Sequence, residues 1–305
     1  MDVSVIIVTY ESASCIGDCL DAVLAQQGID AEVVVVDNAS TDGTLEVARQ
    51  RKSKQLRIIA NTENLGFGKG CNQAFAGSQG RFIYLLNPDA QLVEPDSLLR
   101  LCRALDEHPE WGLAGTALLG ADGMPEPPPE TTYPGQSRAA NDFAALPGKI
   151  AWVLGASMFV RRNVYDVLCG FDPDFFLYSE EIDFCLRLRK QGYEIGYLDE
   201  IRVRHIGGVS EGGRDPYEVW MRRTKGLHLF WSKHYAPEDI AGLVEFDAAR
   251  ARRRMRLNGF LARLLPGNSK PWQKMRQYQA IFEASEKFLS EMRMEGSNQE
   301  SAPGI

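Results

Sequence analysis

An apolar, aromatic-rich run at residues 81–86 stops abruptly at Asn87-Pro88-Asp89, and this ending strongly constrains the fold. The run is typical of a buried β-strand. Pro88 has no N–H to donate to a sheet ladder, so the strand must end there and leave Asp89 at its carboxyl edge. Ligands of open α/β sheets bind at this edge. Asp89 is therefore either a turn-capping residue or a carboxylate that holds a divalent cation.

Two more apolar, β-branched runs lie upstream, at residues 3–8 and 32–36, and each also ends in polar residues. Segments with helical spacing follow them, at 13–27 and 44–52. A further short strand at 56–59 and a helix at 70–76 then lead into the strand at 81–86. Strands that alternate with helices of this length predict βαβ units and a mostly parallel sheet.

The ends of these strands carry polar side chains that can form one site. Thr9 and Glu11 follow the first strand, Asp37 follows the second, and Asn87 and Asp89 follow the fourth. Because the carboxyl ends of parallel strands lie at one edge of a sheet, we expect these side chains to converge there.

Composition sets outer bounds on the class of protein. With 305 residues, 44% of them hydrophobic, the chain can bury a full core. The formal net charge of −7 offers no global attraction to nucleic acid. No apolar run approaches the ~18 residues that span a bilayer, and the short apolar run after Asp2 does not predict a signal peptide. Six cysteines without a C-x-x-C pair are expected to be reduced core residues of a cytoplasmic protein.

The segment 120–149 contains six prolines and several glycines, which predicts an absence of regular elements. Loops of this length in compact domains are usually functional or disordered. Two interpretations stay open: a loop on the acceptor side that orders on binding, and a disordered insertion.

Residues 151–162 are predicted to form a strand in which Gly155 permits a close backbone approach. After a turn with aromatic residues, the helical pattern of 179–189 begins with Ser179 as its expected cap. Its first turn is acidic, with Glu180, Glu181 and Asp183. Such residues either complement the helix macrodipole or include a carboxylate held in a cleft as a general base.

Two later segments carry further candidate residues. His205 ends a short predicted strand, 201–205, and is either structural or a ligand of a metal or phosphate. The helix predicted at 216–235 mixes aromatic residues with cations that include Arg222, which suits contact with a pyrophosphate or a solvated amphipathic face.

Six segments together resemble motifs of the family 2 inverting glycosyltransferases, which have the GT-A fold, and of their bacterial rhamnosyltransferase-type members in particular. The similarity runs from about residue 3 to residue 235, and it is specific because the motifs occur in the right order. The motifs are Val-Ser-Val-Ile-Ile-Val-Thr-Tyr (3–10), Val-Val-Val-Asp-Asn-Ala-Ser-Thr-Asp-Gly (34–43), Asn-Leu-Gly-Phe-Gly (64–68), Leu-Leu-Asn-Pro-Asp (85–89), Glu-Glu-Ile-Asp-Phe-Cys-Leu-Arg (180–187) and His-Ile-Gly-Gly-Val-Ser (205–210).

The resemblance implies a Rossmann-like α/β fold with a mixed, mostly parallel central sheet flanked by helices. It implies a GT-A domain at 1–235 with 120–149 as its proline-rich loop. Outside the resemblance, the residue pattern predicts a helical C-terminal extension at 236–295, and the polar residues 296–305 predict a disordered tail. The resemblance also implies a nucleotide-sugar donor. The residues expected to bind this donor are Thr9, Tyr10, Glu11, Asp37, Asn64, Gly66, Asn72, Asn87, Trp152, Gly155, Ala156 and Arg222.

In the implied reaction, Asp89 and His205 hold Mg²⁺ or Mn²⁺, which neutralises charge on the leaving diphosphate. Glu181 matches the family's usual catalytic Asp and removes a proton from the acceptor hydroxyl, with Glu180 and Asp183 as the neighbouring candidates for the base. Direct displacement then inverts the anomeric carbon. The expected donor is dTDP-rhamnose, with UDP-sugars next, and the expected acceptor is a glycan or a polyprenyl-diphosphate-linked glycan.

Three departures bear on these roles. Glu11 stands where relatives commonly have Asn, and Glu181 is one methylene longer than Asp. Asn87 stands where many relatives carry the first carboxylate of an Asp-x-Asp motif, which leaves Asp89 as the single acid of that motif.

Residues 248–265 form a predicted basic amphipathic helix. Such helices bind anionic membranes, which predicts a peripheral contact with the inner face of the cytoplasmic membrane, or they pack on a domain or in an oligomer interface. The competing class for the whole chain is a nucleotide-sugar-binding regulator without catalytic activity. A nucleotidyltransferase would normally show a glycine-rich loop after the first strand, and residues 9–15 contain no glycine.

Overall fold

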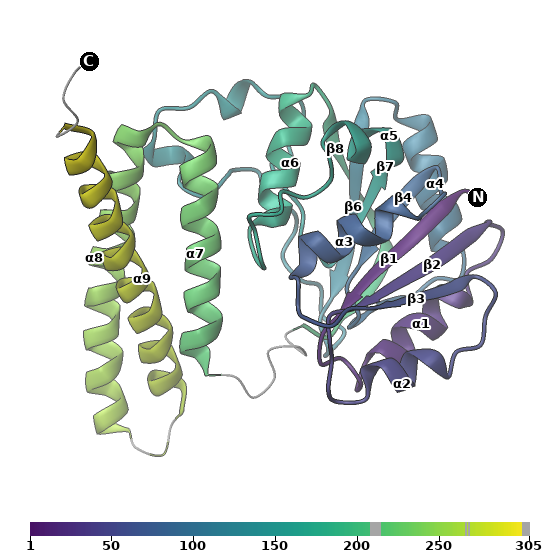
Figure 1. Cartoon of the computed structure of the whole chain (residues 1–305), viewed down its shortest axis with the longest axis horizontal. Coiled ribbons are helices and arrows are strands. Elements are labelled where there is room, and N and C mark those ends of the chain that lie inside the picture. The colour runs from purple at the N-terminus through teal and green to yellow at the C-terminus, as the bar shows by residue number, and fades with distance from the viewer. Residues whose placement is uncertain (208–214, 266, 268, 301–305) are drawn as a thin grey trace. The chain divides into compact units, whose positions relative to one another are not determined.

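The structure is a computed structural model that describes residues 1–207, 215–265, 267 and 269–300 (Figure 1). Contacts divide the chain into two compact units, and each is described by itself. Unit 1 comprises Met1–Tyr133 and Ala144–Gly212, and unit 2 comprises Pro134–Phe143 and Gly213–Ile305.

Unit 1 is built on one eight-stranded sheet with the order β3-β2-β1-β4-β7-β6-β8-β5. β1 pairs in parallel with β2 and β4, β2 with β3, and β6 with β8, while the other three pairings are antiparallel. The predicted mixed, mostly parallel sheet is therefore confirmed. The strands are β1 Val3–Thr9, β2 Ala31–Asp37, β3 Leu56–Ala60, β4 Phe82–Leu86, β5 Ala90–Leu92, β6 Trp111–Leu119, β7 Ser157–Arg161 and β8 Glu194–His205.

Helices cover both faces of this sheet, because successive strand residues point to opposite sides. One face of β1, with Val5 and Ile7, packs in a core with apolar residues of α1 and α4. The other face, with Ile6 and Val8, packs in a second core with residues of α3, α5 and α6. The helices of unit 1 are α1 Ile16–Leu24, α2 Thr44–Arg49, α3 Phe67–Ala76, α4 Ser97–Glu107, α5 Arg162–Val167 and α6 Glu180–Lys190.

The chain changes its place in the sheet at the residues that follow β4. Only Asn87, Pro88 and Asp89 separate β4 from β5, yet β5 pairs with β8 at the far edge of the sheet. The antiparallel register places Ala90 opposite His205. Asp89 therefore lies where the chain leaves one part of the sheet and joins another.

Several predicted boundaries are corrected by the structure. The strand predicted over 151–162 is limited to β7, because Trp152 makes only an isolated bridge with Glu130. Ser179 occupies the cap position of α6 but makes no side-chain cap hydrogen bond, so its predicted capping role is wrong. Its φ of 71° lies in the left-handed region, and so does the φ of 74° at Tyr178. Two such residues in succession store strain beside the acidic turn of α6.

The segment 120–149 holds only two single-turn 3₁₀-helices, η1 Gln136–Arg138 and η2 Phe143–Ala145. Its middle part, Pro134–Phe143, belongs to unit 2. Trp231 Nε1 and Tyr235 Oη both donate hydrogen bonds to the Pro134 carbonyl oxygen, at 2.9 and 2.8 Å. The proline-rich segment thus contributes to both units, whereas the sequence placed it wholly in the first.

Unit 2 contains the helices α7 Pro216–His234, α8 Pro237–Leu264 and α9 Ser269–Glu300. The sequence placed α7 in the N-terminal domain, but its contacts group it with α8 and α9. The predicted helical C-terminal extension is confirmed, and α9 continues through residues 296–300, where a tail was expected. Residues 301–305 of that expected tail lie outside the described residues. None of the helices described has the length and apolar character needed to cross a bilayer.

Candidate active site

The ends of β1 and β2 are joined by hydrogen bonds between buried side chains. Thr9 Oγ1 donates to Asp37 Oδ1 at 2.9 Å, and the same oxygen accepts from Ser40 Oγ at 2.6 Å. Ser40 N also donates to Asp37 Oδ2 at 3.0 Å. These donors hold the Asp37 carboxylate at the carboxyl edge of the sheet, where the sequence predicted it.

Glu11 holds the neighbouring loop. Its carboxylate Oε1 accepts hydrogen bonds from Thr41 N at 2.9 Å and from Thr41 Oγ1 at 3.1 Å. Its own N–H donates to Ser40 Oγ, and its φ of 52° lies in the left-handed region. These hydrogen bonds of Glu11 hold the loop after β2, next to half-buried Tyr10.

Gly66 ties the third motif to the acidic loop. Asn64 Oδ1 accepts from Gly66 N at 3.0 Å, and Asn38 Nδ2 donates to the Gly66 carbonyl oxygen at 3.1 Å. Gly66 has a φ of 89°, and a Cβ atom there would lie 2.3 Å from the Phe176 carbonyl oxygen. Only glycine fits this close approach, which brings the residues just before α6 against the start of α3.

Asn72 is engaged elsewhere in unit 1. Its Nδ2 donates to the Phe171 carbonyl oxygen at 2.7 Å, and its Oδ1 accepts from Tyr165 Oη at 2.7 Å. These bonds join α3 to the turn after α5, so the predicted contact of Asn72 with a nucleotide stays a prediction.

The end of β4 lies beside the segment that precedes β7. Asn87 N donates to the Ala156 carbonyl oxygen at 3.1 Å. A Cβ atom on neighbouring Gly155 would lie 3.6 Å from the Cβ of Glu181, so the Gly155 backbone lies near the Glu181 side chain. The structure therefore brings Asn87, Ala156, Gly155 and Glu181 together. Trp152, whose Nε1 donates to the Thr132 carbonyl oxygen at 3.2 Å, precedes them in the same segment.

Asp89 and His205 face each other across the β5–β8 pair. Their Oδ1 and Nε2 atoms are 3.5 Å apart, and only 8% and 15% of the two side chains are exposed. The other imidazole nitrogen, Nδ1, lies 3.4 Å from Glu126 Oε1. The imidazole thus lies between two carboxylates, and the contact with Glu126 orients the ring so that Nε2 points towards Asp89. Glu126 was missed by the sequence analysis, because nothing in the proline-rich segment indicates which of its acids approaches a strand.

The arrangement of these donors fits a divalent cation. Two ligand atoms separated by 3.5 Å can both reach one ion at about 2.1 Å each, which is a normal ligand distance for small divalent metals. The described residues contain no cluster of three or more candidate metal ligands, so further ligands would have to come from a diphosphate or from water.

The three acids of α6 have different surroundings. Asp183 is buried and accepts a hydrogen bond from Arg187 Nε at 2.8 Å, which makes it half of an internal ion pair. Glu180 is also buried, and its Oε2 has no hydrogen-bond partner in the described structure. Glu181 is the one acid of the three that is partly exposed. It is therefore the acid of this turn that an acceptor hydroxyl can approach most easily.

The pKa of the Glu180 carboxyl is raised well above its ordinary value of 4.5, first by burial and second by the negative charge of Glu181. The unfolded chain therefore releases this proton at lower pH than the folded chain. It follows that the free energy of unfolding contributed by Glu180 is fully present below pH 4.5 and is lost as pH rises towards the folded pKa.

We expect Glu180→Gln to flatten this pH dependence by removing the titrating group, with a change in slope of up to about 1.4 kcal/mol per pH unit. Urea unfolding followed at a series of pH values from acid to neutral would measure it. An unchanged slope in the variant would show that Glu180 titrates normally in the folded protein.

Arg222 lies on α7 in unit 2 and is half-buried, whereas the residues just described belong to unit 1. Its predicted contact with a pyrophosphate stays a prediction. The residues 208–210 of the last motif lie outside the described part of the chain.

The sheet order and the site together define a GT-A glycosyltransferase fold, and solved structures agree. A mannosyltransferase from Pyrobaculum calidifontis, solved with GDP-Man and Mn²⁺, superposes with a TM-score of 0.59 at 20% identity, covering 94% of this chain and 86% of that one. Staphylococcus aureus TarS 1–349 gives 0.57 at 18% identity, covering 94% and 91%. At these identities the likeness shows the fold alone.

The glycosyl transferase family 2 model matches residues 4–182, and the chain belongs to this family. It is a glycosyltransferase. It is 27% identical over 266 residues to an N-acetylglucosaminyl-diphospho-decaprenol L-rhamnosyltransferase of Mycobacterium tuberculosis, covering 76% of this chain and 84% of the relative. It is 25% identical over 210 residues to the O-antigen chain rhamnosyltransferase RfbN of Salmonella typhimurium, covering 67% and 66%.

Proposed function

We propose that the chain is an inverting L-rhamnosyltransferase that uses dTDP-rhamnose and a hydroxyl of a polyprenyl-diphosphate-linked glycan. The observation that carries the proposal is the similarity to relatives named as rhamnosyltransferases, one of which names a decaprenyl-diphosphate acceptor. The reaction would serve cell-surface polysaccharide synthesis at the inner face of the cytoplasmic membrane.

The donor would bind at the carboxyl edge of the sheet. The Asp37 carboxylate, held by Thr9 and Ser40, is suited to accept hydrogen bonds from the base or the ribose. Asn87, Gly155 and Ala156 lie together and would border the sugar. The nearness of the Gly155 backbone to Glu181 puts the acid beside this border, which suits a base that must reach the acceptor hydroxyl.

A divalent cation held by Asp89 and His205 would supply positive charge for the diphosphate, and Mg²⁺ or Mn²⁺ fits a carboxylate and an imidazole donor. Glu126, on the far side of the imidazole, would orient His205. Asn87 is neutral, so Asp89 supplies the one carboxylate of this motif.

The chemical step needs one proton acceptor. Glu181 takes the proton of the acceptor hydroxyl while the oxygen of that hydroxyl forms a bond to the anomeric carbon. The bond from that carbon to the diphosphate oxygen breaks, and its electron pair leaves with the nucleoside diphosphate. One displacement inverts the anomeric configuration and requires no enzyme nucleophile.

A UDP-sugar is the second candidate donor, because TarS, which shares the fold, is also known in complex with UDP-GlcNAc. Thermal shift with dTDP-rhamnose, dTDP-glucose, UDP-GlcNAc and GDP-mannose, each with Mg²⁺ or Mn²⁺, tests the choice. A donor at about 100 times its Kd stabilises the native state by about 2.7 kcal/mol, a shift of several degrees. We expect the largest shift with dTDP-rhamnose. A larger shift with a UDP- or GDP-sugar would reject this donor, and donor binding without any transfer or hydrolysis would favour a regulator.

A further inference from the structure

The C-terminal part of α8 and the N-terminal part of α9 carry exposed apolar side chains and many cations. We define the hairpin tip as two segments: residues 250–265, which comprise the last part of α8 and the residue after it, and residues 269–278 at the start of α9. The two helices run side by side there (Figure 1). The exposed large apolar side chains of the tip are Leu257, Phe260, Leu264, Leu265 and Trp272, each between 46% and 60% exposed. Side chains of this size are costly to leave in water when they gather in one place.

We propose that the hairpin tip is the surface by which the chain binds an anionic lipid bilayer. This proposal rests on the proposed function and deepens it, since a polyprenyl-linked acceptor lies in a membrane. The proposed surface includes the start of α9 as well as residues 248–265.

Near the tip, one side of α8 packs against α9, and another side carries an exposed apolar stripe. Near the tip, a Cβ atom on Gly259 would lie 3.6 Å from Met275 Sδ, so this side of α8 faces α9. Leu257, Phe260 and Leu264 follow one another at helical spacings of three and four residues. Leu257 and Leu264 point away from the side of Gly259, and Phe260 lies next to them. This stripe is therefore not covered by α9, in agreement with its exposure.

Cations flank the apolar stripe on both sides. On a helical wheel, Arg256 and Arg263 lie beside one edge of the stripe and Arg254 lies beside the other, with Arg253 within it. All four are exposed. Arginines in this arrangement can keep their charges among lipid headgroups while the apolar side chains enter the acyl boundary. Trp272, from the first turn of α9, is of the type enriched at membrane interfaces.

The charge of the tip is of one sign. Residues 250–265 and 269–278 contain nine Lys and Arg and no Asp or Glu, whereas the whole chain carries −7, so the rest carries −16. Arg276 is paired with Asp215, and the other eight cations have exposed side chains. Such a basic segment is attracted to anionic lipid headgroups. A second copy of the same surface would instead place like charges opposite each other across a two-fold axis, which disfavours self-association through the tip.

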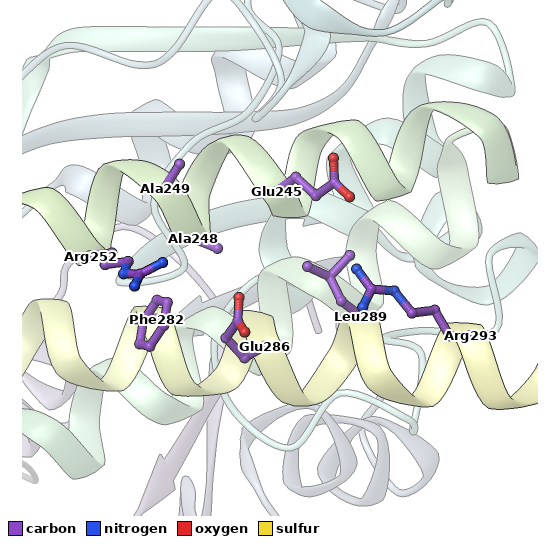
Figure 2. A pocket seen from close by; sticks show the side chains of 8 residues that line it. All are labelled: Glu245, Ala248, Ala249, Arg252, Phe282, Glu286, Leu289 and Arg293. Atoms are coloured by element: carbon purple, nitrogen blue, oxygen red, sulfur yellow. The ribbon is translucent and has the colours of Figure 1, made fainter.

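The cavity between α8 and α9 has a different character (Figure 2). It has a volume of ≈ 190 Å³, and its charged lining residues are Arg252, which also belongs to the tip, and Arg293, Glu245 and Glu286, which lie outside it. Because both signs are present in equal number, this cavity has no net attraction for an anionic surface. The single-signed, exposed part of the hairpin is its tip.

Cosedimentation of the full chain with vesicles tests the proposal without donor or acceptor. With about 0.1 M salt we expect binding to equimolar phosphatidylglycerol–phosphatidylcholine vesicles, and weak binding to phosphatidylcholine alone. Arg253→Glu/Arg256→Glu/Arg263→Glu should weaken binding by about 100-fold or more. Leu257→Ser/Phe260→Ser/Leu264→Ser should weaken it by a similar factor, because three apolar side chains no longer leave water.

Lys52→Glu/Lys54→Glu/Arg103→Glu is the matched control, because these three exposed residues of unit 1 change the net charge equally. It should retain most of the binding. The proposal would be overturned if the wild-type protein does not bind anionic vesicles, or if the tip variants bind them as tightly as the wild type does. Dissociation of a wild-type oligomer by the tip variants, without lipid binding, would assign the tip to self-association instead. Donor-induced thermal shifts should be the same in the tip variants and the wild type. A wrong donor assignment would therefore appear in the thermal shifts alone, and a wrong assignment of the lipid surface in the vesicle binding alone.

Discussion

Glu181→Gln is expected to lower turnover by about 1,000-fold while leaving donor affinity almost unchanged. The amide keeps the size of the side chain and its place near Gly155, but it cannot accept a proton from the acceptor hydroxyl. Single-turnover transfer measured beside donor titration by thermal shift separates the two effects. This is the largest effect we expect, because a missing general base cannot be replaced by positioning alone.

The neighbouring acids Glu180 and Asp183 are the alternative candidates for the general base. Glu180 is buried with a raised pKa, which favours its protonated form, and Asp183 is held by Arg187. Asp183→Asn should therefore lower the melting temperature, since it removes the ion pair of Arg187. Wild-type turnover in Glu181→Gln would refute the assignment of the base. Loss of turnover in folded Asp183→Asn, with Glu181→Gln active, would transfer that role to Asp183.

Asp89→Ala is expected to abolish the metal-dependent part of donor binding. Loss of a residue that only orients a metal ligand costs about 10- to 100-fold in metal affinity, so loss of a ligating carboxylate should cost at least about 100-fold. The effect should be large here because Asn87 cannot substitute for the missing charge. Donor-induced thermal shifts, titrated with Mn²⁺ and with Mg²⁺, would measure it.

Glu126→Gln provides a graded comparison for the same site. It keeps a hydrogen-bond acceptor near His205 Nδ1 but removes the negative charge, so we expect a smaller loss of metal affinity than with Asp89→Ala. Activity of the wild type that persists fully in EDTA would reject the cation. Equal metal affinity in Asp89→Ala and the wild type would place a cation elsewhere.

The parallel half of the sheet was predictable from the sequence because its strands are apolar runs, rich in β-branched residues in β1 and β2 and in aromatic and aliphatic residues in β4. β1, β2 and β4 are buried along their whole or nearly whole length, and such strands are almost continuously apolar. By contrast, β5 has three residues and no period to detect, so its pairing with β8 could not be inferred. Irregular residues 151–156 resembled a strand because they are mostly apolar, but they do not join the ladder: Ala151, Val153 and Ala156 are buried, whereas Leu154 is exposed.

The candidate site was predictable to the extent that its residues end strands. Asp37, Asn87 and Asp89 lie at the carboxyl edge for that reason, and His205 ends β8. Contacts that depend on loops were not predictable, such as the approach of Glu126 to His205. Ser179 illustrates a different limit: its residue type favours capping, but the left-handed backbone before α6 leaves its side chain without that hydrogen bond.

The crossing from β4 to β5 has a consequence for the order in which the chain assembles. The parallel strands β1 to β4 are complete by Leu86, so their pairing can form early during synthesis. Asp89 meets His205 only after β8 has been made, more than a hundred residues later, and has paired with β5. Pairing at such a separation requires a large loop to close first, and it is slow for that reason. A nascent or truncated chain would thus hold the folded edge proposed to bind the nucleotide while the two proposed cation ligands are still apart. If these ligands hold a cation, metal binding reports completion of the whole sheet.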